Sequence, residues 1–125
     1  MATLFRLLAH AVTHPGLVRA ANEDAVGCQP DRGFFRVADG VGMFPKAARA
    51  SEATLGFLLT QPLPSDPSGL ARQVEQAHQA IRDLALSISP QKGLATTLDV
   101  LRCADRHAYW AHVGDSVIAV AEPRQ

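Results

Sequence analysis

The sequence predicts an α+β fold with antiparallel sheets. Apolar segments rich in β-forming residues fall into two groups, one before residue 40 and one after residue 94, and two helical segments lie together between them. The expected order is therefore three strands, two helices and three strands. This grouping favours antiparallel sheets, because a doubly wound parallel sheet requires strands and helices to alternate.

The first group should contain three strands. Residues 3–12 mix apolar and polar positions before the turn sequence THPG, which favours a strand. Residues 23–29 and 33–39 flank PDRG, whose proline, aspartate and glycine suit a tight connection between paired strands. We therefore expect an antiparallel pair that ends at Asp39, directly before the sequence GVG.

Two helices are expected in the middle of the chain. Alanine and leucine dominate residues 46–60, and apolar residues recur there at three- and four-residue steps. The proline-rich sequence of residues 61–69 ends this helix. Residues 70–88 form a second, amphipathic helix that should begin near Ser68 and end before Pro90. Its apolar face consists of Leu70, Val74, Ala77, Ile81, Leu84 and Ile88.

Three further strands are expected after the helices, at residues 95–103, 107–114 and 116–122. The short sequences ADR and GDS join them. The chain has 125 residues, 47% of them hydrophobic, which suits a single domain with a modest core. The proline-rich loop at residues 62–67 is too short to separate two domains.

Composition excludes several classes of partner. Twelve basic and twelve acidic side chains balance, so the sequence predicts neither a nucleic-acid nor an anionic-membrane surface. No apolar segment approaches the roughly 18 residues that a membrane span needs. Cys28 and Cys103 lack metal-ligand or redox-motif spacing and are interpreted as ordinary reduced thiols. We therefore expect a soluble, cytoplasmic protein.

Three acidic residues are expected at strand ends. Asp24 lies at the start of a strand, Asp39 at the end of the next, and Asp115 between two later strands. Each alone suits a turn. Together, and with Arg19 nearby, they are equally consistent with a site for phosphate and a hard cation, because Mg²⁺ and Mn²⁺ prefer oxygen ligands. Both interpretations remain open at this point.

Three ordered motifs then distinguish the sequence. THPGLVRAANEDAV resembles the opening R-x-x-N-E-D motif of the metal-dependent protein phosphatases of the PP2C (PPM) family, in their compact bacterial form, and FFRVADGVG resembles their V-A-D-G-x-G motif. GLATTLDV and YWAHVGDSV resemble their paired G-x-x-T-T and V-G-D-S-R motifs. The resemblance covers residues 13–120. It implies an antiparallel β-sandwich flanked by helices. It also implies that residues 1–125 form one partial domain, which corresponds to the N-terminal half and is incomplete at the C-terminus.

The resemblance implies roles for individual residues. Arg19 matches the arginine that holds the substrate phosphate, a contact that suits the planar guanidinium fork. Asp39 matches the catalytic aspartate that bridges two metal ions, and Gly40 the glycine whose backbone carbonyl is a further ligand.

The remaining acids match the second and third metal positions. Asp24, with Glu23 beside it, resembles the acidic pair that ligates the second metal directly or through water, and Asp24 is the preferred ligand. Asp115 resembles the aspartate of a looser third site. The implied cofactors are two Mn²⁺ or Mg²⁺ ions, with a possible third.

The implied reaction is hydrolysis of phosphoserine or phosphothreonine monoesters by a metal-activated water. The implied partners are a phosphorylated protein substrate and a serine/threonine kinase or its targets. Ser51 is expected to serve in packing or capping. No histidine lies at a motif position that assigns it a role; the five are His10, His14, His78, His107 and His112.

The sequence also departs from the family pattern. Met43 and Phe44 replace a glycine and a commonly polar residue, and Val117 replaces the arginine after G-D-S. The later T-x-D-H, S-D-G and D-N motifs are missing. Unpaired sheet edges would favour self-association.

Three interpretations of these departures remain: a fragment of an enzyme, a chain completed by a partner, or a noncatalytic pseudophosphatase that binds phosphoproteins. A small α+β domain whose acids are only turn residues is a further alternative.

Overall fold

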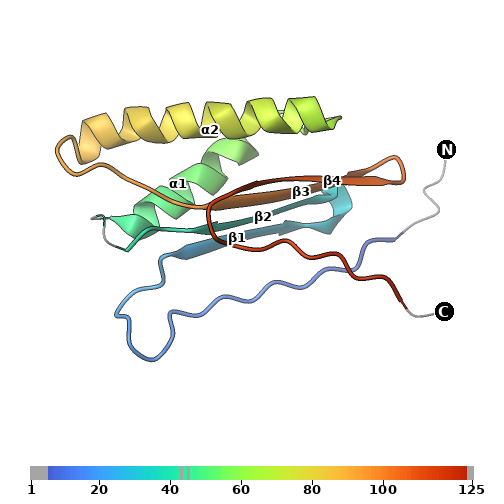
Figure 1. The fold of residues 1–125 in the computed structure, drawn as a ribbon, viewed down its shortest axis with the longest axis horizontal. Helices are drawn as coiled ribbons and strands as arrows, with labels where there is room; N and C mark the ends of the chain where they lie inside the picture. Colours follow the sequence, from blue (N-terminus) through green and yellow to red (C-terminus); the bar gives the residue numbers. More distant parts are fainter. Residues whose placement is uncertain (1–5, 43, 45, 124–125) are drawn as a thin grey trace.

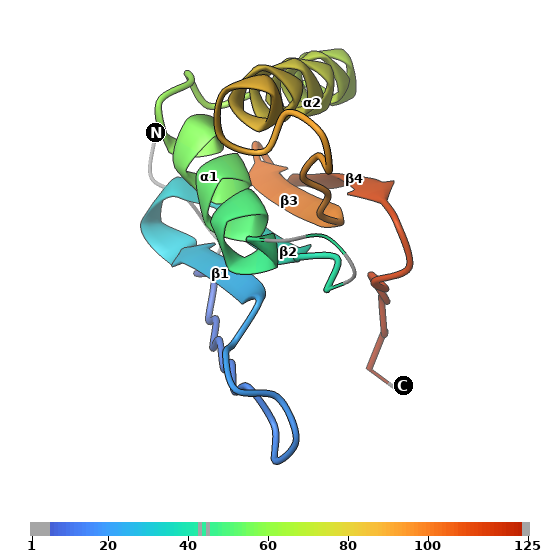
Figure 2. The ribbon, with the colours of Figure 1, turned by 90° about the vertical axis from the view of Figure 1, so that its left-hand side faces the viewer.

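The computed structural model describes residues 6–42, 44 and 46–123 (Figure 1). It contains four strands, two α-helices and a short 3₁₀ turn. They are β1 (Asp24–Gln29), η1 (Pro30–Arg32), β2 (Phe34–Asp39), α1 (Ala47–Leu59), α2 (Pro67–Ile88), β3 (Leu98–Ala104) and β4 (His107–Val113). The strands form one antiparallel sheet in the order β1-β2-β3-β4. Both helices cover the same face of this sheet (Figures 1 and 2), which confirms the α+β class.

The β1–β2 hairpin is tight because its turn residues suit the backbone. Pro30 begins η1, and Gly33 ends it with φ 59°, in the left-handed region that glycine adopts without strain. The Gly33 N–H donates to the Pro30 carbonyl at 3.0 Å. This turn sets a register in which Asp24 is opposite Asp39.

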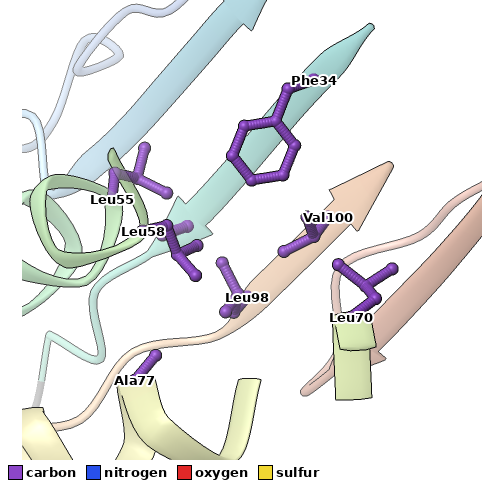
Figure 3. Close-up of a cluster of buried hydrophobic side chains, with 8 residues drawn as sticks. Phe34, Leu55, Leu58, Leu70, Ala77, Leu98 and Val100 are labelled. Atoms are coloured by element: carbon purple, nitrogen blue, oxygen red, sulfur yellow. The ribbon is translucent and has the colours of Figure 1, made fainter. Parts of the chain in front are cut away.

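The core lies between the sheet and the two helices (Figure 3). Side chains of β2 and β3 alternate across the sheet, so every second residue meets the helices. The buried apolar cluster consists of Phe34, Ala38, Leu55, Leu58, Leu70, Ala77, Leu98 and Val100. Because α1 and α2 share this cluster, each helix is held on the sheet by its apolar face.

The helix boundaries agree with the sequence prediction within two residues. α2 begins at Pro67, one residue from the predicted start near Ser68, and the Asp66 side chain caps it by accepting the Gly69 N–H at 2.6 Å. No helix in the described part of the chain is long and apolar enough to cross a bilayer. Cys28 and Cys103 are not joined by a disulfide.

Two predicted strands are wrong. Residues 6–12 are not a strand, while residues 3–5 of that prediction lie outside the described residues, and residues 116–122 are not a strand either. Both segments run on the side of the sheet opposite the helices (Figure 1), where the described residues offer them no strand partner. An apolar pattern alone does not stabilise a strand that is not paired with a neighbouring strand. The described residues therefore form one sheet and not both sheets of a sandwich.

Arg36 is buried in the core, on the helix side of β2, with only 4% of its surface exposed. Its guanidinium lies 4.8 Å from the centroid of the Phe34 ring. It also lies against Gly27, where a Cβ atom would overlap the guanidinium. Its Nε and Nη1 have no hydrogen-bond partner among the described residues. Burial, and secondarily the charge of Arg32, lower the pKa of Arg36 below its ordinary value. These features indicate a charge that costs stability.

We expect Arg36→Met to raise the free energy of unfolding by about 1–3 kcal/mol, because methionine removes the unpaired buried donors and keeps the volume. Urea unfolding would measure this. Arg102→Met is the matched control on β3, because the Arg102 side chain donates to the Pro64 and Arg32 carbonyls at 3.1 and 2.7 Å. Its replacement should therefore lower the free energy of unfolding. A destabilised Arg36→Met protein would contradict this account.

Candidate active site

Two aspartates face each other at one end of the β1–β2 hairpin. Asp24 is the first residue of β1, Asp39 is the last of β2, and the register pairs them directly. Opposite residues of an antiparallel pair have Cβ atoms roughly 4.5–5.5 Å apart, so their side chains share one face of the sheet. Both residues are exposed. Two adjacent carboxylates of this kind favour a cation between them.

The backbone after Asp39 is held by neighbouring segments on both sides. The Gly40 N–H donates to the Glu23 carbonyl and the Val41 N–H to the Ala95 carbonyl, each at 2.9 Å. A Cβ atom at Gly40 would overlap the Ala47 carbonyl, so only glycine fits where the chain turns into α1.

Ser51 supports the same backbone from α1. It is fully buried, and its hydroxyl lies 2.7 Å from the Glu23 carbonyl and 3.0 Å from the Ala48 carbonyl, to which it can donate. The predicted packing role of Ser51 therefore agrees with its position.

Arg19 forms an ion pair beside the aspartates. Its Nη1 donates to Glu23 Oε1 at 2.6 Å, and this pair lies against Gly42, where a side chain would clash with it. The Arg19 side chain remains 64% exposed. Glu23 thus holds the arginine, while the preference for Asp24 over Glu23 as a metal ligand stays a prediction.

All six residues predicted for the site line one cavity of about 370 Å³. They are Arg19, Glu23, Asp24, Asp39, Gly40 and Asp115. Among the other lining residues, three have polar side chains without a predicted role: His14, Asn22 and Thr97. The six residues therefore lie together in the structure, while their membership of a functional site and their individual roles stay predictions.

Asn22 shapes the start of β1. Its side-chain oxygen accepts the Asp24 N–H at 3.0 Å, and its side-chain nitrogen donates to Thr13 Oγ1 at 2.7 Å. Asn22 belongs to the N-E-D sequence, so the motif could have pointed to it.

His14 is the one of the five histidines that lines this cavity. Its Nδ1 accepts the Gly16 N–H at 2.9 Å, so Nε2 carries the proton in the neutral ring. His112 lies elsewhere, within 2.5 Å of the buried Asp99. No sequence pattern separates these two histidines, because only the fold brings His14 to the acids.

Asp39 titrates differently from an ordinary aspartate. Burial, a hydrogen bond to Asp24 and the charges of Asp24 and Asp115 raise its pKa, while Arg19 lowers it by less. The negative charges of Asp24 and Asp115 therefore affect Asp39 more than the positive charge of Arg19 does. A bound divalent cation would relieve this repulsion.

The carboxylates fit a cation only in part. Within the described residues, no three His, Cys, Asp or Glu side chains are close enough to hold a metal ion. Asp24, Asp39 and the Gly40 carbonyl offer hard oxygen ligands, but a cation that requires about six oxygens would take the others from water or additional groups. Met43, expected at the mouth of this site, lies outside the described residues.

No protein-family model and no curated protein matches the sequence. Solved structures do match. The serine/threonine phosphatase PstP/Ppp of Mycobacterium tuberculosis superposes with a TM-score of 0.70 at 27% identity, over 83% of this chain and 45% of that one. The PPM Ser-Thr phosphatase MsPP of Mycobacterium smegmatis, in complex with cacodylate, gives 0.70 at 28% identity, over 84% and 44%.

The described fold matches part of the fold of the PPM-family serine/threonine phosphatases. This confirms the predicted family resemblance. A PPM-type catalytic domain, that of PstP in complex with two manganese ions, also matches with a TM-score of 0.69 at 28% identity, over 83% of this chain and 46% of that one. The chain thus spans slightly less than half the length of these PPM-family structures.

The raised pKa of Asp39 predicts a pH dependence of stability without metal. The folded protein binds a proton at Asp39 more tightly than the unfolded chain does. This contribution is complete below the ordinary pKa of an aspartate and is lost as the pH rises through the raised pKa. The quantity to compare, with EDTA present, is the difference in free energy of unfolding between the wild type and Asp39→Asn. This difference, taken as wild type minus variant, should fall as the pH rises from the ordinary pKa of an aspartate to the raised pKa of Asp39.

Urea unfolding at a series of pH values would measure the difference. Asp24→Asn should reduce the fall, because it removes the neighbouring negative charge. A difference that rises with pH would contradict the assigned repulsion.

Proposed function

We propose that this chain supplies the cation-binding and phosphate-binding residues of a metal-dependent phosphatase for phosphoserine and phosphothreonine in proteins. The observation that carries the proposal is the Asp24–Asp39 pair, which shares one cavity with Arg19. The PPM-type fold supports it, because the matching structures include a catalytic domain with two manganese ions.

Asp39 and Asp24 would ligate Mn²⁺ or Mg²⁺ with the Gly40 carbonyl, and Asp115 would serve a looser third position at the cavity wall. Divalent cations in such a site supply Lewis acidity beside the phosphate and lower the pKa of water. Arg19 would bind the phosphate through guanidinium N–H groups other than the one that donates to Glu23. Glu23 keeps the arginine at the cavity wall, so the phosphate would lie next to the two aspartates.

The proposed partners are a phosphorylated protein and a serine/threonine kinase or its targets. A cytoplasmic setting belongs to the same proposal and rests on the two unpaired cysteines. Open strand edges at β1 and β4, within the described sheet, favour self-association.

A noncatalytic role is the second candidate. The absence of a three-ligand cluster among the described residues favours it, since a site with few ligands binds cations weakly. In that role the chain would bind phosphoproteins through Arg19 without hydrolysing them. We expect the 125-residue chain alone to turn over substrate slowly or not at all.

Manganese binding tests the cation site. Electron paramagnetic resonance titration of the chain should detect weak Mn²⁺ binding that Asp39→Asn reduces by roughly tenfold or more, because this substitution removes a charged ligand. Asp31→Asn, in η1 at the other end of the hairpin, is the matched control and should bind as the wild type does.

Equal affinities in the wild type and Asp39→Asn would refute the assigned site. Tight binding of two ions would mean that other acids, such as Glu52 or Asp99, or a second copy of the chain complete it.

Phosphopeptide assays separate the two candidate functions. Manganese-dependent release of phosphate from a phosphothreonine peptide, lost in Asp39→Asn, would support the enzyme, whereas peptide binding without release would support the noncatalytic role. Arg19→Lys should weaken peptide affinity in either case, because an ammonium cannot reproduce the two-pronged contact. Unchanged affinity in Arg19→Lys would remove Arg19 from the phosphate site.

A further inference from the structure

Thr97 makes two hydrogen bonds to Asp39, one in each direction. The Asp39 N–H donates to the Thr97 hydroxyl at 3.0 Å, and the Thr97 N–H donates to the Asp39 carbonyl at 2.9 Å. The register continues from Val37 opposite Asp99 to Gly40 opposite Thr96, which brings Asp39 opposite Thr97. The hydroxyl therefore accepts the bond that a backbone carbonyl would accept in a regular ladder.

The same hydroxyl also reaches the segment that carries Asp115. Thr97 Oγ1 lies 3.1 Å from Ser116 Oγ, a distance at which either oxygen can donate to the other. Gly114 has φ 111° and packs so closely that a Cβ atom there would lie 2.6 Å from Thr97 Cγ2. The turn after β4 thus folds against Thr97, and one buried threonine, 8% exposed, contacts both acid-bearing segments.

A hydroxyl suits this position because it accepts and donates at once. Valine has the same shape but would leave the Asp39 N–H without its acceptor and the Ser116 hydroxyl without its partner. The Asp39 backbone would then lose one of the hydrogen bonds that hold it relative to Asp24, and the Asp115 segment would lose its side-chain bond to Thr97.

We propose that Thr97 is a positioning residue of the cation site: its hydroxyl fixes the Asp39 backbone and ties the Asp115 segment to it. This inference rests on the proposed function, because it concerns the cation that Asp39 and Asp24 would bind. Thr97 touches no reacting group, so its effect should appear in cation affinity.

The test compares Mn²⁺ affinity in Thr97→Val and Thr97→Ser by paramagnetic resonance. Thr97→Val should bind Mn²⁺ roughly tenfold more weakly than the wild type, because loss of a group that orients a metal ligand has an effect of this size. Thr97→Ser, which keeps the hydroxyl, should retain most of the Mn²⁺ affinity. Thr54→Val is the matched control. Thr54 is 2% exposed and donates to the Ala50 carbonyl at 2.8 Å within α1, so its replacement should leave Mn²⁺ affinity unchanged.

Amide hydrogen exchange gives a second measurement that needs no metal. The Asp39 amide should exchange faster in Thr97→Val than in the wild type or Thr97→Ser. Wild-type Mn²⁺ affinity in Thr97→Val, or unchanged exchange at Asp39, would overturn the inference and leave the proposed function intact.

Failure of the wild type itself to bind Mn²⁺ would refute the proposed function instead. If Thr97→Val does not fold, Ser116→Ala decides, because this substitution of a half-buried residue removes only the tie to the Asp115 segment. Its Mn²⁺ affinity should fall, and an unchanged value would overturn the inference.

Discussion

The register of the β1–β2 hairpin is the constraint on which the candidate site depends. It places Asp24 opposite Asp39, so two carboxylates with like charge occupy adjacent positions on one face of the sheet. A slip of one residue would send one of them to the other face. The tight turn through Gly33 and the burial of Phe34 and Ala38 against the helices fix this register. The packing of the core therefore maintains a repulsion that a cation would relieve.

Support for the acids comes from three separate parts of the chain. α1 contributes Ser51, which reaches the Glu23 carbonyl, and the segment before β3 contributes Thr97, which reaches Asp39. The loop before β1 contributes the Arg19–Glu23 ion pair. The ion pair is local in sequence, but the contacts of Ser51 and Thr97 join residues far apart in the chain. These two contacts exist because α1 packs on the sheet and β3 pairs with β2, so stability of the fold and geometry of the site are linked.

The sequence predicted what local patterns determine. The hairpin and both helices follow from turn residues and apolar periodicity, and the motifs identified the residues that line the cavity. The predictions of strands at residues 3–12 and 116–122 failed where the structure describes these segments, because a strand also requires a paired neighbour, and residues 6–12 and 116–122 do not pair with the described sheet. The roles of Thr97 and His14 were missed for a related reason. The hydrogen bonds of Thr97 to Asp39 and Ser116, and the place of both residues in the cavity, arise only from tertiary packing.

The proposed function requires the Asp24–Asp39 pair to bind a divalent cation. Anomalous diffraction from crystals of the chain grown with MnCl₂ tests it most directly, since manganese is located without any assumption about activity. The account predicts an anomalous peak within about 2–2.5 Å of carboxylate oxygens of Asp24 and Asp39, the range of metal–oxygen distances for hard cations. No peak at this pair, with manganese bound only at other acids, would contradict it.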